Sequence, residues 1–403
     1  MSIWYDADEN IAAGSRPAGA RTHVVAIGAS AYKGLPLPGP LPPQVTEQNP
    51  FALTQVDSPA TSAFSVASWF RYKLNNPRAP IGKIWLLLSP SPHESSVNPG
   101  LQAAATSERR AITANAAADL TSWRAACSTS PRNIAILYAA GHGIARSQDD
   151  SLVLLEDFGE QIQPIAGSLD MGGLKRGMFG SGRAQTQLFF ADACRISPEN
   201  AGKLQGLGGL SFREDGTGSD HRSVAMYFSA TPYESALALR GRPTLFGQAL
   251  IDCLDSLAVV GPDETDPNWH VTTDSLTAKL KRRVSDLAKA QNRVQDTAHN
   301  EQGGSVTLHV CKTPPQVNLT IQVNPAPDVS KTWIRLWTGN RRTKVKDRET
   351  FASHPFQVDG LDPGLYSLDV GFTPPPDKPF EDLVGIAVDA QRPPVPPCLV
   401  DFL

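Results

Sequence analysis

The chain has 403 residues, of which 40% are hydrophobic and 19% are charged, a composition typical of a globular protein with a sizeable core. Its formal net charge of −3 gives no electrostatic reason to expect binding to nucleic acid or to an anionic membrane. No stretch approaches the roughly 18 consecutive apolar residues of a membrane span, and the N-terminus, which carries Asp6, Asp8 and Glu9, lacks the apolar segment of a secretory signal.

The cysteines are odd in number and widely spaced, and no two of them form a CxxC pair. They are Cys127, Cys194, Cys253, Cys311 and Cys398. A disulfide framework or a zinc ribbon is therefore not expected. Zinc-binding HExxH motifs and calcium-binding DxDxDG loops are also missing, so we expect no metal and no cofactor. The pattern indicates the reducing cytoplasm, where a single thiol can stay reactive.

Along the chain, residues 1–20 are expected to form a flexible tail. Apolar segments of strand length then alternate with segments of helical period. The predicted strands are Thr22–Ser30, Lys83–Ser89, Asn133–Ala140, Ser151–Leu155, Gln187–Ala191 and Ser223–Ala230, and the predicted helices are Ala63–Leu74, Ala111–Ala126, Leu245–Leu257 and Thr273–Ala290. Continuous apolar strands separated by helices predict an α/β domain over residues 21–312, with a mostly parallel sheet flanked by helices.

The pattern changes near residue 313. Short alternating strands, separated by Pro and Gly turns, predict a small β-sandwich domain of immunoglobulin or transthyretin type over residues 313–403. The segment FQVDGLDPGLYSLDV resembles one hairpin of transthyretin-like sandwiches.

Two residues with nucleophilic and basic side chains follow two of the predicted strands. Strand Asn133–Ala140 leads into Gly141-His142-Gly143, and strand Gln187–Ala191 leads into Asp192-Ala193-Cys194. The carboxyl ends of parallel strands meet at one edge of a sheet. A cysteine nucleophile needs a base, and imidazole suits that task at neutral pH. We therefore interpret Cys194 as a nucleophile and His142 as its base, with the backbone amides of Gly143 and Cys194 as oxyanion donors.

These motifs resemble the caspase/metacaspase superfamily of cysteine peptidases. The resemblance rests on YAAGHG and FFADACR at the two strand ends, on ATPYESALAL and PTLFGQALIDCL further on, and on the 52-residue separation of His142 and Cys194. It covers about residues 20–312 and implies a caspase-haemoglobinase fold of bacterial type with endopeptidase activity. Two positions depart from the family pattern: Ala140 stands where a serine is common, and Ile196 where a small residue is common.

Asp192 bears on which peptide bond would be cut. Residues two apart in a strand share a face, so Asp192 is expected on the side of Cys194. A carboxylate there disfavours the thiolate unless a cation neutralises it. The resemblance implies cleavage after Arg or Lys (the P1 residue), with Asp192 at the floor of the S1 pocket that holds that side chain. A basic P1 side chain would then also favour the Cys194 thiolate. The alternative is that Asp192 caps a loop or orients His142.

Two further acidic residues are candidates for the walls of the same pocket. Glu234 follows the strand Ser223–Ala230, and Asp57 lies in the long loop after the first strand. The alternative for each is a solvated surface carboxylate.

Residues 197–222 form a long, polar, Gly-rich segment directly after the proposed nucleophile. Segments of this length without periodicity are typically functional or unstructured. The corresponding segment of caspases is where their two subunits are separated. Lys203, Arg213 and Arg222 are therefore candidate sites of zymogen processing, by the protein itself or by an upstream protease, with an activating partner as a further expectation. A plain surface loop is the alternative.

Other functional classes have no motif here. The sequence contains no P-loop, no GxGxxG fingerprint after the first strand and no GxSxG elbow. Two alternatives to an endopeptidase of protein or peptide substrates stay open: a catalytically silent caspase-like scaffold that only binds partners, and an amidase acting on small substrates.

Overall fold

The computed structural model of the chain describes residues 2–11, 19–40, 43–46, 49, 51–145, 151–160, 165–180, 182–195, 208–214, 216, 220–231, 240–262, 267–324, 330–338, 343–349, 353–361, 364–372, 382–390 and 398–401. The chain divides into two compact units. The first contains Met1–Val260 and His270–Val310, and the second contains Gly261–Trp269 and Cys311–Leu403. The division falls two residues before the predicted boundary and assigns an additional loop, Gly261–Trp269, to the second unit.

The first unit is built on a seven-stranded sheet with the order β1-β3-β2-β4-β8-β9-β12. Its strands are β1 (Ile3–Asp6), β2 (Thr22–Ala29), β3 (Ile81–Ser89), β4 (Ile134–Gly141), β8 (Thr186–Ala193), β9 (Ser223–Phe228) and β12 (Ala298–Gln302). The five central strands run parallel, and β1 and β12 pair antiparallel at the two edges. The predicted α/β fold with a mostly parallel sheet flanked by helices is thus confirmed.

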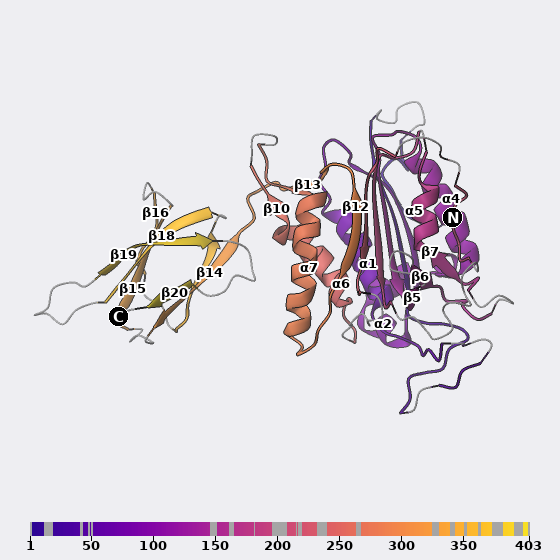
Figure 1. The fold of residues 1–403 in the computed structure, drawn as a ribbon, viewed down its shortest axis with the longest axis horizontal. Helices are drawn as coiled ribbons and strands as arrows, with labels where there is room; N and C mark the ends of the chain where they lie inside the picture. Colours follow the sequence, from indigo (N-terminus) through magenta and orange to yellow (C-terminus); the bar gives the residue numbers. More distant parts are fainter. Residues whose placement is uncertain are drawn as a thin grey trace, which may run out of the picture. The chain divides into compact units, whose positions relative to one another are not determined.

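The central strands are buried on both faces because helices cover the sheet from two sides. Helices α1, α6 and α7 lie on one face and α4 and α5 on the other (Figure 1). Their bounds are α1 Pro59–Tyr72, α4 Thr113–Cys127, α5 Met171–Gly177, α6 Leu245–Asp252 and α7 Thr273–Lys289. A π-helical turn at Cys253–Leu257 continues α6, which accounts for the longer helix expected from the sequence.

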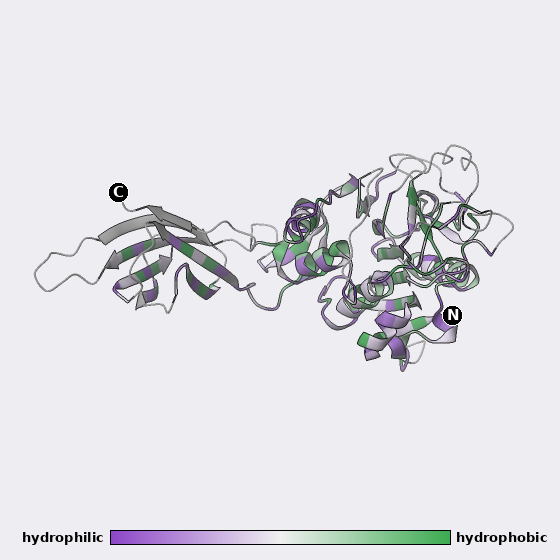
Figure 2. Ribbon diagram, turned by 90° about the horizontal axis from the view of Figure 1, so that it is seen from below, coloured by the Kyte–Doolittle hydropathy of each residue, from purple (hydrophilic) through white to green (hydrophobic). Residues whose placement is uncertain are grey.

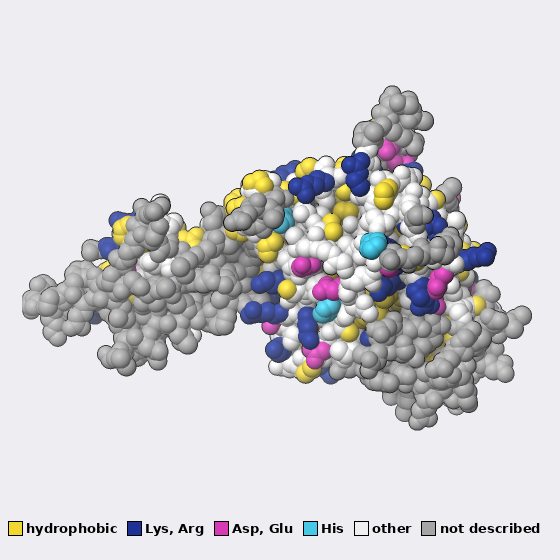
Figure 3. Space-filling model, turned by 45° about the horizontal axis from the view of Figure 1, so that its top comes forward, with side chains coloured by type: hydrophobic (Ala, Val, Ile, Leu, Met, Phe, Trp, Pro, Cys, Tyr) yellow, Lys and Arg dark blue, Asp and Glu magenta, His cyan; other side chains and the backbone are white. Residues whose placement is uncertain are grey.

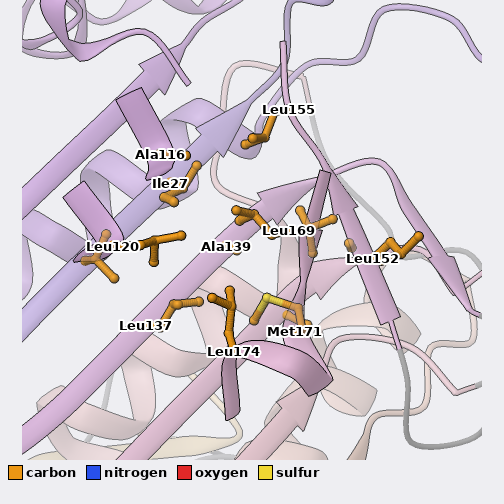
Figure 4. Packing of buried hydrophobic residues seen from close by; sticks show 14 of the residues in the cluster. Ile27, Ala116, Leu120, Leu137, Ala139, Leu152, Leu155, Leu169, Met171 and Leu174 are labelled. Atoms are coloured by element: carbon orange, nitrogen blue, oxygen red, sulfur yellow. The ribbon is translucent and has the colours of Figure 1, made fainter. Parts of the chain in front are cut away.

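The hydrophobic core on the α4 side of the sheet also contains residues from three short strands outside that sheet (Figure 4). Leu120 from α4 packs near Leu137 of β4, while Leu152 and Leu169 come from a small antiparallel sheet. That sheet contains β5 (Gly143–Ala145), β6 (Ser151–Leu154) and β7 (Ser168–Asp170). On the α1 side, Gly28 of β2 allows close approach, because a Cβ there would lie 2.6 Å from the Pro59 carbonyl oxygen.

Smaller elements complete the first unit. Two short helices, α2 and α3, follow β3, and three short strands, β10, β11 and β13, form an antiparallel sheet beside α7. The bounds are α2 Pro92–Val97, α3 Pro99–Ala104, a 3₁₀ turn at Ser107–Arg109, β10 Val259–Val260, β11 His270–Thr272 and β13 Thr307–Val310.

The prediction of a flexible tail over residues 1–20 is wrong for Ile3–Asp6, which forms edge strand β1 against β3. Aromatic contacts hold the strand in place. The Trp4 ring lies 5.9 Å from the ring of Phe64 and 6.5 Å from that of Tyr72, and the Arg71 guanidinium lies 4.6 Å above the Trp4 ring. Such contacts add to the burial of the rings. With four residues, the segment is too short for its periodicity to reveal a strand.

The second unit contains only strands among its described residues. They form a three-stranded sheet, β17-β14-β20, and a four-stranded sheet, β16-β15-β18-β19. The bounds are β14 Val317–Asn324, β15 Thr332–Thr338, β16 Lys344–Glu349, β17 Phe356–Leu361, β18 Gly364–Phe372, β19 Asp382–Ala390 and β20 Cys398–Asp401. Polar and apolar residues alternate along the strands of this unit that are coloured in Figure 2, as expected for sheets with one buried face.

Surface charge is mixed on the described part of the first unit. Lys and Arg side chains intermingle with Asp and Glu on the face drawn in Figure 3. Within the described ranges, no helix is both long and apolar enough to cross a membrane.

Candidate active-site cleft

A cleft of about 990 Å³ lies at the carboxyl ends of the parallel strands of the first unit. This edge is where open α/β sheets bind ligands. The cleft is lined by Ala31, Leu37, Pro38, Gln55, Val56, Asp57, Pro59, Ser91, Pro92, His93, Gly141, His142, Asp192, Cys194, Arg240 and Thr244. All of these residues belong to the first unit.

The structure brings His142 and Cys194 to this one cleft. Strands β4 and β8 are parallel neighbours, and Gly141 pairs with Ala193 at the end of the ladder. His142 and Cys194 are the next residues of the two strands, so they leave the sheet at the same level. Both are half-buried, and neither is covered by the core. Cys194 is not in a disulfide.

The His142 ring is oriented by a backbone carbonyl. Its Nε2 lies 2.6 Å from the Thr54 carbonyl oxygen. Since a carbonyl only accepts, Nε2 carries the proton, and Nδ1 keeps its lone pair for another partner. Burial lowers the pKa of His142 from its usual value, although the bond to Thr54 opposes this shift. The imidazole is therefore a neutral base near pH 7.

Tyr32 fixes the backbone of His142 through a hydrogen bond. Its hydroxyl accepts a hydrogen bond from the His142 N–H at 2.8 Å and donates to the Ala29 carbonyl at 2.9 Å. The rings of Tyr32 and His142 are 5.1 Å apart. Burial raises the pKa of Tyr32, so the phenol stays protonated and keeps both bonds.

Gly143 lies directly against the backbone of Cys194. A Cβ at position 143 would come within 2.1 Å of the Cys194 carbonyl oxygen and 2.7 Å of the Ala193 side chain. Only glycine fits there without displacing the end of β8. Its role as an oxyanion donor stays a prediction, but its place beside the Cys194 backbone is compatible with that role.

Asp192 is a buried carboxylate, 2% exposed, that reaches the cleft. Its Oδ2 accepts hydrogen bonds from the Tyr138 hydroxyl and the Thr244 hydroxyl. Its Oδ1 makes no hydrogen bond within the described part of the chain. Ser229 lies close enough to affect the Asp192 pKa, but its hydroxyl donates to the Ala193 carbonyl at 3.0 Å.

Burial dominates the charge state of this carboxylate. It raises the pKa of Asp192 to about 6, although the hydrogen bonds from Thr244 and Tyr138 oppose the shift. An incompletely satisfied carboxylate in a cleft is chemically suited to bind a cation.

Asp57 lies at the side of the cleft and is not a freely solvated acid. Its carboxylate accepts hydrogen bonds from Ser91 Oγ at 2.5 Å and His93 Nδ1 at 2.8 Å. The Arg240 side chain, which is 77% exposed, approaches it at 3.6 Å. The expectation that Asp57 could be a solvated surface carboxylate is therefore wrong.

Three other positions that the sequence singled out lie outside the described residues. They are Glu234, Lys203 and Ile196. Arg213 is exposed and follows Phe212, whose ring stacks on Trp123 at 6.4 Å. An exposed basic residue beside an anchored aromatic one keeps its place as a processing candidate.

Arg222 as a processing site is contradicted by its burial. The residue is 5% exposed and stands just before β9. Its guanidinium is bound by both oxygens of Asp220, by Gln187 Oε1 at 2.9 Å and by the Lys175 carbonyl. A protease needs the chain around the cut to be accessible. Arg222 is therefore a structural arginine that fixes the entry into β9.

Two other cysteines contrast with Cys194. Cys127 and Cys253 are fully buried. Burial raises the pKa of Cys127 well above its usual value and that of Cys253 to about 12, so both thiols stay protonated and inert. Among the described side chains, no group of three or more His, Cys, Asp or Glu residues could hold a metal ion.

Several residues of the cleft were not found from the sequence. Thr54 acts through its carbonyl, which has no residue-type signature. Tyr32 follows β2, and Ser91 and His93 lie at the start of helix α2, all far along the chain from His142 and Cys194, and no local motif marks them. Thr244 carried a signal, because a threonine before the apolar helix α6 is a typical N-cap, and its hydroxyl does accept the Gly247 N–H.

No family model matches the chain, and no curated protein matches it. Among solved structures, the chain is similar to the crystal structure of protein GSU0716 from Geobacter sulfurreducens. The two share 10% sequence identity over 70% of this chain and 94% of that chain, with a TM-score of 0.39. So distant a likeness establishes neither the fold nor the function of this chain.

Proposed function

We propose that the protein is a cysteine endopeptidase that cleaves peptide bonds after Arg or Lys, with Cys194 as the nucleophile and His142 as its base. The observation that carries the proposal is the convergence of these two residues from paired strands β4 and β8 on one cleft. The fixed proton on His142 Nε2, bound to Thr54, supports it further, because it leaves Nδ1 to accept a proton.

The chemistry follows from these groups. His142 Nδ1 takes the thiol proton, and the Cys194 sulfur attacks the carbonyl carbon of the P1 residue. The oxyanion is held by the amides of Gly143 and Cys194. The C–N bond then breaks, and the imidazolium returns the proton to the leaving amine. Water hydrolyses the thioester, which releases the acid and restores the thiol.

Asp192 is the proposed floor of the S1 pocket. The support is its place in the cleft beside Cys194 and its Oδ1, which lacks a hydrogen-bond partner within the described residues. A guanidinium or ammonium group would satisfy that oxygen and neutralise the buried charge. Asp57 is the proposed side wall. Glu234 stays a prediction without structural support.

We also infer that the first unit is a caspase-like domain and that the two sheets of the second unit form a β-sandwich. The two catalytic-type motifs and the order of elements support the first inference. The buried residues Ile321 and Val358 of one sheet and Leu336 and Leu368 of the other support the second, since each sheet has an apolar face to bury. Action in the cytoplasm remains a proposal from the cysteine pattern, and activation by a partner or an upstream protease remains one from the resemblance.

The test is a scan of fluorogenic peptides that differ only at P1, with wild-type protein and Cys194→Ala. We expect cleavage after Arg and Lys by the wild type, with none by the variant. Preference for Asp at P1 would overturn the S1 assignment.

Two other outcomes point to the alternatives. A catalytically silent scaffold would cleave no peptide and would show no loss of activity on alkylation. An amidase of small substrates would hydrolyse an arginine amide but would leave longer peptides intact, because they would not fit the cleft.

A further inference from the structure

The side wall of the cleft is made of two chain segments that lie far apart in the sequence. One is the turn at Asp57 before helix α1, and the other begins at Ser91 before helix α2. Asp57, Ser91 and His93 line the cleft. Glu94 lies behind them, is completely buried and does not line the cleft.

Glu94 binds both segments through its two carboxylate oxygens. Oε1 accepts hydrogen bonds from the Ser58 N–H at 3.0 Å and from the Thr61 N–H and hydroxyl, both at 2.9 Å. Oε2 accepts from the Ser91 N–H at 2.8 Å. Glu94 is also part of the capping box of α2, whose N-cap is Ser91. One buried carboxylate thus joins the starts of two helices.

The turn at Ser58 needs this support. Ser58 has a φ of 102°, a backbone conformation that non-glycine residues rarely adopt and that costs conformational energy. Its own side chain makes no capping bond to α1. Glu94 supplies the cap instead, at the N–H of Thr61. The strained turn therefore keeps its geometry because a buried acceptor from elsewhere in the chain holds it.

The strained turn sets the position of Asp57, the next residue toward the N-terminus. The Asp57 carboxylate bridges back to the other segment, through Ser91 Oγ at 2.5 Å and His93 Nδ1 at 2.8 Å. The two segments are thus joined twice: behind the wall by Glu94 and at its surface by Asp57.

We propose that Glu94 is a positioning residue that fixes the Asp57 carboxylate in the wall of the cleft and thereby sets the affinity of the cleft for a cationic side chain. The inference rests on the proposed function only for the identity of that cation as a P1 Arg or Lys. Glu94 acts through Asp57, because the carboxylate of Glu94 is committed to four donors and lies outside the cleft.

The first experiment measures binding and does not need catalysis. Benzamidine, a small amidinium, is titrated by calorimetry into Cys194→Ala protein carrying Glu94→Gln, Asp57→Asn or both. Gln fills the same volume, but its NH₂ group faces a donor where the carboxylate accepted a bond. We expect Glu94→Gln to weaken binding about tenfold, as Asp57→Asn does, since a lost bond to a charged group has that magnitude.

The double variant decides whether the two residues act together. If Glu94 acts through Asp57, the double variant binds no more weakly than Asp57→Asn alone. Glu160→Gln, which removes an exposed carboxylate paired with Lys33, is the control and should bind as the parent does. Each of three results would overturn the inference. They are unchanged benzamidine affinity in Glu94→Gln, a double variant whose loss of affinity is the product of the two single losses, and no benzamidine binding by the parent.

A second variant protects the test against poor folding. Ser58→Gly relieves the positive φ, because glycine adopts it without strain. The pair Ser58→Gly/Glu94→Gln should therefore fold, yet it should still bind benzamidine about tenfold more weakly than Ser58→Gly alone, because the link to Ser91 is lost. Equal binding of these two variants contradicts a positioning role.

Kinetics separate positioning from a general structural effect. In protein with Cys194 intact, Glu94→Gln should raise KM for a P1-Arg peptide and leave kcat within about twofold, with no change for a P1-norleucine peptide. A merely structural role would lower kcat/KM for both peptides. Benzamidine binding with the expected pattern but no peptide cleavage would refute the proposed function and keep this inference. Cleavage after Arg without any effect of Glu94→Gln would do the reverse.

Discussion

At the scale of single residues, the two reactive side chains differ in how their environments prepare them. His142 has its proton fixed on Nε2 by Thr54 and its backbone fixed by Tyr32. Among the described cysteines of the first unit, Cys194 is half-buried, whereas Cys127 and Cys253 are fully buried and burial raises their pKa. This combination of an oriented base and an accessible thiol is what nucleophilic catalysis requires.

Removal of either group should abolish turnover. We expect Cys194→Ala and His142→Ala each to lower kcat by roughly 10³-fold or more, and the double variant to be no worse than Cys194→Ala, because the pair acts as one unit. Single-turnover cleavage of a P1-Arg peptide measures this. Cys127→Ala is the matched control, since its thiol is fully buried and does not line the cleft. An active Cys194→Ala protein would contradict the assignment of the nucleophile.

Asp192 should make substrate binding depend on pH. Its pKa is raised to about 6, so it is protonated below that pH and cannot attract a cation. We expect KM for a P1-Arg peptide to rise about tenfold per pH unit below 6 and to level off above it. Asp192→Asn should bind the peptide weakly at all pH values and lose this dependence. A wild-type KM that is flat between pH 5 and 7 would count against Asp192 as the S1 floor.

The same shift affects stability, with the sign fixed by linkage. Because the folded-state pKa of Asp192 lies above the value of about 4 in an unfolded chain, its contribution favours folding below pH 4 and is lost as pH rises through about 6. Asp192→Asn should therefore gain stability relative to wild type as pH rises from 4 to 7 in urea titrations, on top of any constant loss from its altered bonds to Tyr138 and Thr244. A difference between the two proteins that does not change over this pH range would contradict the raised pKa.

At the scale of elements, the sequence located strands by apolar continuity and missed those without it. Strands β2, β4, β8 and β9 were predicted within a few residues, because burial on both faces leaves a run of apolar side chains. Strand β12, with the sequence AHNEQ, lies at an exposed edge and has no such run. Strand β16, KVKDRE, lies at the edge of its sheet, and Val345 is its one apolar residue.

Edge strand β1 should contribute measurably to the first unit. We expect Trp4→Ala to lower the free energy of unfolding by roughly 1–2 kcal/mol, because it removes ring contacts with Phe64 and Tyr72 and the stacking of Arg71. Urea denaturation at pH 7 measures the change. Val294→Ala, at a residue that is 80% exposed, should shift the midpoint little. Equal stability of Trp4→Ala and wild type would mean that β1 is held by backbone pairing alone.

The close approach of β5 to the end of β8 gives another element-scale prediction. Gly143→Ala places a Cβ within 2.1 Å of the Cys194 carbonyl oxygen, so the strand end has to move. We expect kcat to fall roughly 10²-fold, since a shift of about 1 Å at a reacting group has that effect. Gly304→Ala, where a Cβ meets nothing within 4 Å, should leave activity unchanged. Full activity of Gly143→Ala would rule out a tight fit at this position.

At the scale of the whole molecule, the parallel sheet explains both what the sequence revealed about the cleft and what it left hidden. Residues that follow directly after strands, such as His142 and Cys194, could be brought together from topology alone, because parallel strands share one carboxyl edge. The wall residues Asp57 and His93 could not be paired from the sequence, because their contact depends on the loop paths after β2 and β3. Such paths follow from packing and not from periodicity.

The sheet also determines what processing would do to the molecule. The segment that carries Arg213 joins β8 to β9, and these strands pair in parallel from Thr186 with Ser223 to Ala191 with Phe228. A cut at Arg213 would leave the two fragments joined within one sheet. We therefore expect wild-type protein to yield two fragments on a denaturing gel but one unchanged mass under native conditions, while Cys194→Ala stays intact in both.

The position of the cut tests whether processing occurs at the exposed Arg213 and not at the buried Arg222. Intact mass spectrometry should place it after Arg213 or in the segment containing Lys203, and Arg213→Ala should remove the first of these. Arg222→Ala should not change the cleavage pattern but should lower stability, because its guanidinium is buried against Asp220 and Gln187. A cut after Arg222 would contradict the burial argument. A single identical species from wild type and Cys194→Ala would exclude self-processing. Strands β8 and β9 would then pair within one uncut chain.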